Sequence, residues 1–150
     1  MDPLSIAGSV VGLTATCLQT AKALHDLKDR FKYADITIAA ICTETTIISV
    51  SLSRIQSSML TDASKLGEKL QEGGLSSTLD AALTGCYVVF DVLQSEINKL
   101  ADLNNIANPE PLKFKGKAKL IWNESLMQEL LGQLRGLQTS LTLLLQLLTT

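Results

Sequence analysis

The chain opens with nineteen residues, Pro3 to Ala21, that carry no charge. As an α-helix this stretch would be about 29 Å long, close to the ~30 Å hydrocarbon thickness of a bilayer. Its six strongly apolar residues would supply at most ~2–4 kcal/mol of insertion free energy, which the Ser, Thr and Gln residues between them oppose. These six are Leu4, Ile6, Val10, Val11, Leu13 and Leu18. We therefore expect a helix that can be buried in a protein core under one condition and enter a membrane under another.

The first residues predict a helix start and not a secretory signal. Asp2 follows Met1 without a basic segment before the apolar run, so we expect a cytoplasmic chain. Asp2 and Pro3 are typical of an N-cap and the first helical position. Gly8 and Gly12 form a G-x-x-x-G pair, a pattern that permits close approach of another backbone. The pattern fits packing in a protein core as well as assembly in a membrane.

Composition indicates one domain of the helix-bundle class. The 150 residues are 46% hydrophobic but only 4% aromatic, so a core would be built from Leu, Ile, Val and Ala. The net charge of −2 argues against nucleic acid as a partner. Cys17, Cys42 and Cys86 are odd in number and lie among apolar neighbours, which indicates buried, reduced thiols and neither disulfides nor a metal site.

Periodicity predicts four long helices, beginning with one from about Pro3 to Lys32. The second segment is rich in β-branched residues, yet its apolar stripe repeats every three or four residues and so favours a helix. The stripe runs through Ile38, Ile41, Thr45, Ile48, Leu52, Ile55 and Met59. The 61–75 connection has room for a short extra helix. With two long connections and one short one, we expect an all-α fold, an antiparallel four-helix bundle.

Two further stripes define the third and fourth helices. The third helix is expected to begin near Ser76 or Ser77, and the fourth to span about Lys117–Leu148. The inward-facing residues are Leu79, Leu83, Cys86, Phe90, Leu93, Ile97 and Leu100 in the third, and Leu126, Leu130, Leu134, Leu137, Leu141, Leu144 and Leu148 in the fourth. No charge follows Arg135, so residues 1–150 are interpreted as a single domain from the N-terminal part of a longer protein.

No arrangement of residues predicts an enzyme. The one histidine, His25, lies on a charged helical stretch without partners for a triad or a metal site. Gly116-Lys117 lacks the upstream glycine and the following Ser or Thr of a phosphate-binding loop. We therefore expect no catalysis, no cofactor, no metal and no small-molecule substrate.

Four lysines alternate near the end of the third connection. Lys113, Lys115, Lys117 and Lys119 lie beside Phe114 and Trp122, with no acidic residue among them. Basic residues near anionic headgroups contribute about 1 kcal/mol each, so the cluster is a candidate lipid-headgroup site. The alternative is a solvated loop whose two aromatic residues pack into the bundle.

Three stretches carry a resemblance to a known family: the opening MDPLSIAGSVVGL, the helix end Leu93–Leu103, and LIWNESLMQELLGQLRGLQTSLTLLLQLL. They resemble the HeLo-like N-terminal domains of fungal cell-death proteins. HeLo-like domains precede nucleotide-binding oligomerisation modules or amyloid-signalling motifs, and they are similar to the four-helix bundle of the necroptosis pseudokinase. The resemblance implies a cytoplasmic domain that self-associates on activation, relocates to the plasma membrane and permeabilises it in fungal immunity or heterokaryon incompatibility.

Applied to this chain, the resemblance makes the membrane-inserting residues Leu4, Ile6, Gly8, Val10, Val11, Gly12, Leu13 and Leu18. Some relatives carry an acidic residue in this helix, and this chain has none between Pro3 and Ala21, which favours general permeabilisation over an ion-selective pore. An alternative from another class is a non-lytic adaptor that oligomerises or docks NLR-like partners through its surface.

Overall fold

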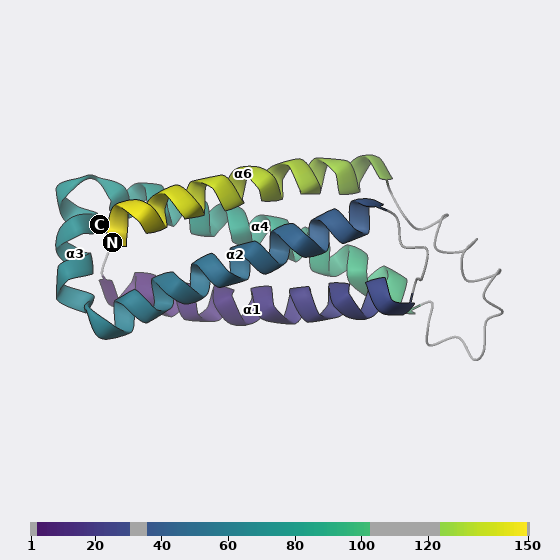
Figure 1. The fold of residues 1–150 in the computed structure, drawn as a ribbon, viewed down its shortest axis with the longest axis horizontal. Coiled ribbons are helices and arrows are strands. Elements are labelled where there is room, and N and C mark those ends of the chain that lie inside the picture. Colours follow the sequence, from purple (N-terminus) through teal and green to yellow (C-terminus); the bar gives the residue numbers. More distant parts are fainter. Residues whose placement is uncertain (1–2, 31–35, 103–123, 150) are drawn as a thin grey trace.

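The computed structural model describes the backbone of residues 3–30, 36–102 and 124–149, and the side chains of residues 9–27, 36–99 and 124–149. Within these ranges the protein is all-α, as predicted, with five helices and no strand (Figure 1). The helices are α1 (Pro3–Arg30), α2 (Ile36–Thr61), α3 (Ala63–Glu72), α4 (Leu75–Asp102) and α6 (Glu124–Thr149). The expected helix start at Asp2 and the expected helical residues 31, 32 and 117–123 lie outside the described ranges.

Helix α2 forms despite its many β-branched residues. Ile38, Ile41, Thr45, Ile48, Leu52 and Ile55 are buried and Met59 is partly buried, so the predicted stripe is the core-facing side of the helix. Two threonines outside the stripe donate their hydroxyls to the carbonyl four residues earlier, Thr43 to Ala39 at 3.0 Å and Thr46 to Cys42 at 2.8 Å. Burial of the stripe outweighs the modest preference of these residues for β-strands. The prediction that this segment is a helix is confirmed.

The four long helices form a closed ring of neighbours in which α1 and α6 each contact α2 and α4. Consecutive long helices run antiparallel, but α1 and α4 run parallel. Ser9 of α1 contacts Tyr87 of α4, and further along both helices Thr20 contacts Gln94. Helices α2 and α6 are also parallel, since Thr37 bonds Glu124 at their starts. The ring therefore contains two parallel and two antiparallel contacts, which the sequence analysis did not anticipate.

Helix α3 explains how two parallel pairs arise. It contacts α2, α4 and α6 at one end of the molecule, where α1 begins and α6 ends (Figure 1). A ten-residue helix is about 15 Å long, enough to cross from α2 to the diagonally placed α4, which is about 14 Å away when neighbouring axes are ~10 Å apart. Leu66 and Leu70 bury the inner side of α3, and Gly74 adopts a φ of 62° at the turn into α4. The short helix predicted in the 61–75 connection is thus confirmed.

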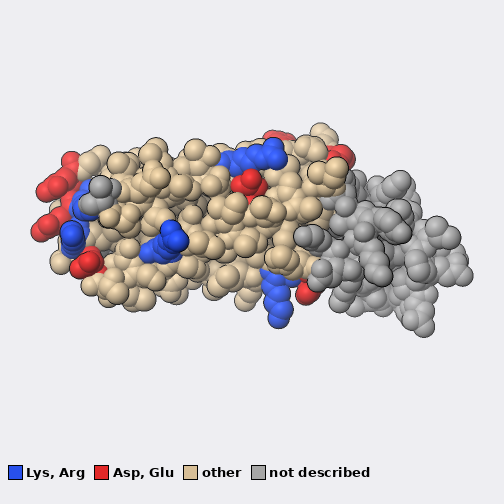
Figure 2. Space-filling model, viewed as in Figure 1, with Lys and Arg blue, Asp and Glu red and all other residues tan. Residues whose placement is uncertain are grey.

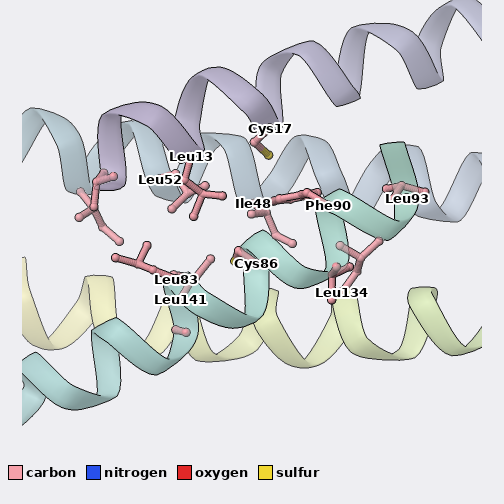
Figure 3. Packing of buried hydrophobic residues seen from close by; sticks show 14 of the residues in the cluster. Leu13, Cys17, Ile48, Leu52, Leu83, Cys86, Phe90, Leu93, Leu134 and Leu141 are labelled. Atoms are coloured by element: carbon pink, nitrogen blue, oxygen red, sulfur yellow. The ribbon is translucent and has the colours of Figure 1, made fainter. Parts of the chain in front are cut away.

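All four long helices supply the core, which is dominated by leucine and isoleucine with Phe90 as its largest fully buried side chain (Figure 3). The predicted stripe of α4 is buried from Leu79 to Ile97, while the side chain of Leu100 lies outside the described ranges. In α6 the residues predicted to face inward do so, although Leu126 and Leu137 are only partly buried. Met127 and Leu131 are also buried, which was not predicted. Helix α4 begins at Leu75, directly after the glycine turn and before the predicted Ser76 or Ser77.

Candidate functional site

Helix α1 has an apolar side facing the core and a second apolar side facing solvent. Val10 and Leu13 are completely buried, whereas Val11 and Leu18 are 47% and 51% exposed. Gly12 lies on the exposed side. Leu4, Ile6 and Gly8 belong to α1, but their side chains lie outside the described residues. Of the predicted inserting residues that are described, two are therefore core residues in this state and three face outward.

The polar groups of α1 are largely satisfied within the helix. The hydroxyl of Thr14 donates to the Val10 carbonyl at 2.6 Å, that of Thr16 to the Gly12 carbonyl at 3.1 Å, and that of Thr20 lies 2.9 Å from the Thr16 carbonyl. A hydroxyl bonded to its own helix keeps that bond when the helix changes surroundings, which lowers the free-energy cost of leaving water. From the sequence alone, these threonines are expected only to oppose insertion.

The inner side of α1 rests on α2 through a thiol. The Sγ of Cys17 donates to the backbone carbonyl of Thr45 at 3.4 Å. Burial raises the pKa of Cys17 to about 12, with a smaller contribution from the nearby Cys86 thiol, and burial raises the pKa of Cys86 to about 12 as well. Cys17, Cys42 and Cys86 are buried, reduced thiols, as predicted. High thiol pKa values make Cys17 and Cys86 poor nucleophiles while α1 is docked.

The G-x-x-x-G prediction requires a correction at Gly12. A Cβ atom on Gly12 would meet the Tyr87 hydroxyl of α4 at 3.3 Å, so the glycine makes room for a side chain and not for a neighbouring backbone. The same hydroxyl donates to the Ser9 carbonyl at 3.4 Å. Sequence spacing identified the small residue but could not identify what approaches it, because the parallel pairing of α1 with α4 was not predicted.

The surface around α1 and α2 carries few charges. Figure 2 shows a face made mostly of uncharged side chains, with acidic and basic side chains mainly towards its two ends; α3, at one end, holds Lys65, Glu68, Lys69 and Glu72. Between α1 and α2 there is an open hollow of about 280 Å³. Its lining is formed by Leu18, Ser49, Val50, Ser53, Arg54 and Ser57. Leu18 is thus the residue of α1 that lines this hollow.

Helix α2, and not α1, is the most apolar long helix in the described ranges. By length and composition alone it is the one described helix that could cross a membrane, with a mean hydropathy of 1.5 over its best window. Half of that window is buried, so the packing of α2 in the core accounts for its apolar character. Helix α1 is the predicted inserting helix because residues 3–21 carry no charge, and that is a different property from high hydropathy.

The other residues singled out in the sequence are the lysine cluster, the candidate metal ligands and His25. The four lysines Lys113, Lys115, Lys117 and Lys119 lie outside the described residues, as do Phe114 and Trp122. Among the described residues, no group of three or more His, Cys, Asp or Glu side chains could hold a metal ion. His25 is exposed on α1. No protein-family model, no curated protein and no solved structure matches the chain.

Proposed function

We propose that this chain is a HeLo-like four-helix-bundle domain that permeabilises membranes when α1 leaves its place beside α2 and α4. The observation that carries the proposal is the double character of α1: buried Val10 and Leu13 on one side, exposed Val11 and Leu18 on the other, with no charge from Pro3 to Ala21. Exposed apolar residues also occur on α2, α4 and α6, but in α1 they belong to a segment of nineteen residues without a charge. In a membrane both sides are in contact with lipid and both contribute to insertion.

The two positions of α1 are close in free energy, which suits a switch. The docked helix buries Val10, Leu13 and Cys17 but leaves Val11 and Leu18 half in water. The inserted helix covers all of them, and its threonine hydroxyls keep the hydrogen bonds to Val10, Gly12 and Thr16. A trigger that weakens docking by a few kcal/mol is enough to shift such an equilibrium. Self-association of the activated domain would add further stabilisation of the inserted state.

The partners in this proposal are anionic lipids, other copies of the chain, and upstream or downstream NLR-like or amyloid-signalling modules. The lysines at 113, 115, 117 and 119 would bind lipid headgroups and bring a cytoplasmic protein to the plasma membrane. The setting would be fungal immunity or incompatibility, and the outcome necroptosis-like cell death. No enzymatic step, cofactor or small-molecule substrate is part of the mechanism.

A second candidate function is a non-lytic oligomerising adaptor. The observation that favours it is the set of exposed apolar residues on helices other than α1, namely Ile47 and Val50 on α2 and Leu143 and Leu147 on α6. Such residues can contact another protein without any helix leaving the core. In this alternative α1 stays docked throughout signalling.

A disulfide between α1 and α2 separates the two functions. Cys17 Sγ already lies 3.4 Å from the Thr45 carbonyl, and the Thr45 hydroxyl is buried without a hydrogen-bond partner. Thr45→Cys removes that hydroxyl and supplies a second thiol. The bond is formed by refolding in a glutathione redox buffer, because the buried thiol of Cys17 reacts slowly once folded, and non-reducing mass spectrometry verifies it.

Leakage of dye from anionic liposomes is then measured with and without forced oligomerisation. We expect the oxidised variant to be more stable and inactive, and the reduced variant to recover leakage. The matched control, Thr45→Cys with Cys17→Ala, cannot form the bond and should respond to neither oxidant nor reductant. Leakage by the verified, oxidised variant at the parental rate would exclude release of α1 and support the adaptor.

A further inference from the structure

Tyr87 is the only described tyrosine, and its hydroxyl contacts α1 at two points. It donates to the Ser9 carbonyl at 3.4 Å, and it occupies the space that a Cβ on Gly12 would approach to 3.3 Å. Tyr87 belongs to α4. Its neighbour Cys86 is completely buried in the core, whereas Tyr87 itself is 43% exposed. Helix α4 thus extends a hydroxyl over the outer side of α1, the helix that carries the uncharged segment.

We propose that Tyr87 is an autoinhibitory latch, which holds α1 in place by fitting its hydroxyl over Gly12 and onto the Ser9 carbonyl. The inference rests on the proposed function, since it concerns how the docked state of α1 is maintained. A Cβ at position 12 would lie 3.3 Å from the hydroxyl, closer than ordinary contact, so the hydroxyl would have to shift by a few tenths of an ångström. The latch also requires the hydroxyl itself, because a phenylalanine ring cannot donate to the carbonyl.

The position of this contact suits a latch. The bond is long for an O–H···O interaction and lies at the surface, where water or a lipid headgroup can replace either partner. By contrast, Cys17 and Thr45 meet in the interior and are reached only after α1 has moved. In this proposal the contact of Tyr87 with the N-terminal part of α1 therefore breaks first. The contact between Cys17 and Thr45 still holds the later turns of α1 against α2 at that stage.

A double-mutant cycle between Gly12 and Tyr87 tests the latch. The variants are Gly12→Ala, Tyr87→Phe and their combination, and the readout is the rate at which a maleimide labels Cys17 in the folded protein, located by peptide mass spectrometry. Tyr87→Phe should speed labelling about 2–10-fold, the equivalent of one neutral hydrogen bond. Gly12→Ala should speed labelling in the tyrosine background by displacing the hydroxyl. In the phenylalanine background the same substitution should have no accelerating effect, because the hydroxyl that it displaces is gone.

The cycle removes the effect of helix propensity. Alanine is a better helix former than glycine in either background, so that effect cancels when the two Gly12→Ala ratios are compared. Two matched controls are Gly132→Ala on α6, where a Cβ would meet nothing within 4 Å, and Val88→Ala, an exposed residue next to Tyr87. Neither control should speed labelling of Cys17. Circular dichroism verifies that each variant is folded.

The outcomes distinguish the latch from the function on which it rests. Equal Gly12→Ala ratios in the two backgrounds would overturn the latch. Unequal ratios with faster labelling would establish it, whether or not leakage follows. If liposome leakage rises together with labelling, the proposed function is supported as well. If labelling rises and leakage stays at the parental rate, the latch stands and membrane permeabilisation by α1 is wrong.

Discussion

The Sγ atom of Cys17 lies 3.4 Å from the backbone carbonyl oxygen of Thr45, which places a thiol of α1 directly against α2 in the interior. The contact joins two antiparallel helices at a point where both residues are fully buried. The thiol therefore reports on the docking of α1, because it reacts only when the two helices separate. Its high pKa has a second consequence, for the pH dependence of stability.

We expect the folded domain to lose stability in alkaline solution because of its thiols. The pKa of Cys17 and that of Cys86 rise from 9.0 to about 12 on folding. A raised pKa means that the contribution is fully present below pH 9 and is lost as the pH rises from 9 towards 12. The free energy of unfolding should fall by up to about 1.4 kcal/mol per pH unit for each thiol in this window.

Urea unfolding between pH 8 and 10.5 in a reducing buffer measures this effect. Cys17→Ala will be less stable than the parent at every pH, since it leaves a small cavity. Above pH 9, however, its free energy of unfolding should fall less steeply with pH than that of the parent, by about the slope that one thiol contributes. Parallel curves for the parent and the variant would show that the Cys17 thiol is not the group that titrates.

A second prediction separates the two sides of α1. Leu18→Glu places a charge on the exposed side, so the free energy of unfolding should change by no more than about 0.5 kcal/mol. The same charge should raise the free energy of membrane insertion by up to about 3 kcal/mol, the cost at the centre of a membrane-spanning helix, and leakage should fall by up to about 100-fold. Val10→Glu is a poorer test, because Val10 is completely buried and the variant would unfold through an unpaired carboxylate.

The matched control for Leu18→Glu is Val88→Glu on α4. Val88 is 59% exposed and α4 is not expected to insert, so its leakage should equal that of the parent. Thermal unfolding followed by circular dichroism verifies that both variants keep their fold. Equal leakage by Leu18→Glu and the parent would mean that this side of α1 never enters lipid.

The extent to which sequence predicted this fold depends on the range of the interactions involved. The stripe from Ile38 to Ile55 is a local pattern, and it correctly identified α2 as a helix with its core-facing side. Which helices pair in parallel is not local. It depends on α3 crossing one end of the molecule to reach α4, and no periodicity within one segment contains that information.

The same distinction applies to the candidate site. The absence of charge around Val10 and Leu18 was visible in the sequence, as was the small residue Gly12. The contact of Tyr87 with Gly12 was not, because it joins residues that are 75 positions apart on parallel helices. Nor could the sequence show that Thr14 bonds the Val10 carbonyl, since a threonine hydroxyl in a helix has several competing partners.

A third prediction concerns Glu44, whose side chain lies between α2 and α6. Its Oε1 is 3.9 Å from Arg135 Nε, and its Oε2 is buried without a hydrogen-bond partner. The ion pair is long and Arg135 is mostly exposed, so Arg135→Ala should lower the free energy of unfolding by less than about 1 kcal/mol. Glu44→Met removes a poorly satisfied buried oxygen and should raise the free energy of unfolding by about 1 kcal/mol.

Urea midpoints at constant m-value measure both changes. Glu129→Met, on the exposed side of α6, is the matched control and should shift the midpoint little. A large loss of stability in Glu44→Met would instead reveal that the carboxylate is well satisfied, for example through bound water. In that case Glu44 stabilises the contact between α2 and α6 and does not destabilise it.

The last prediction tests the lysines at 113, 115, 117 and 119 as a lipid-headgroup site. Replacing all four with Gln removes four positive charges from seven residues and should weaken binding to anionic vesicles by up to ~4 kcal/mol. Exposed charges are screened over about 10 Å at 0.1 M salt, so the difference from the parent should shrink as salt is added. Binding to neutral vesicles should change little. The control replaces Lys65 and Lys69 of α3, in the 61–75 connection, with Gln, which removes two positive charges from another part of the sequence. Vesicle co-sedimentation measures the affinities, and the Cys17 labelling rate verifies that α1 remains docked in both variants. If anionic vesicles bind the quadruple variant as tightly as the parent, the lysines form a solvated loop, and any recruitment to a membrane must come from the uncharged face of α1 and α2.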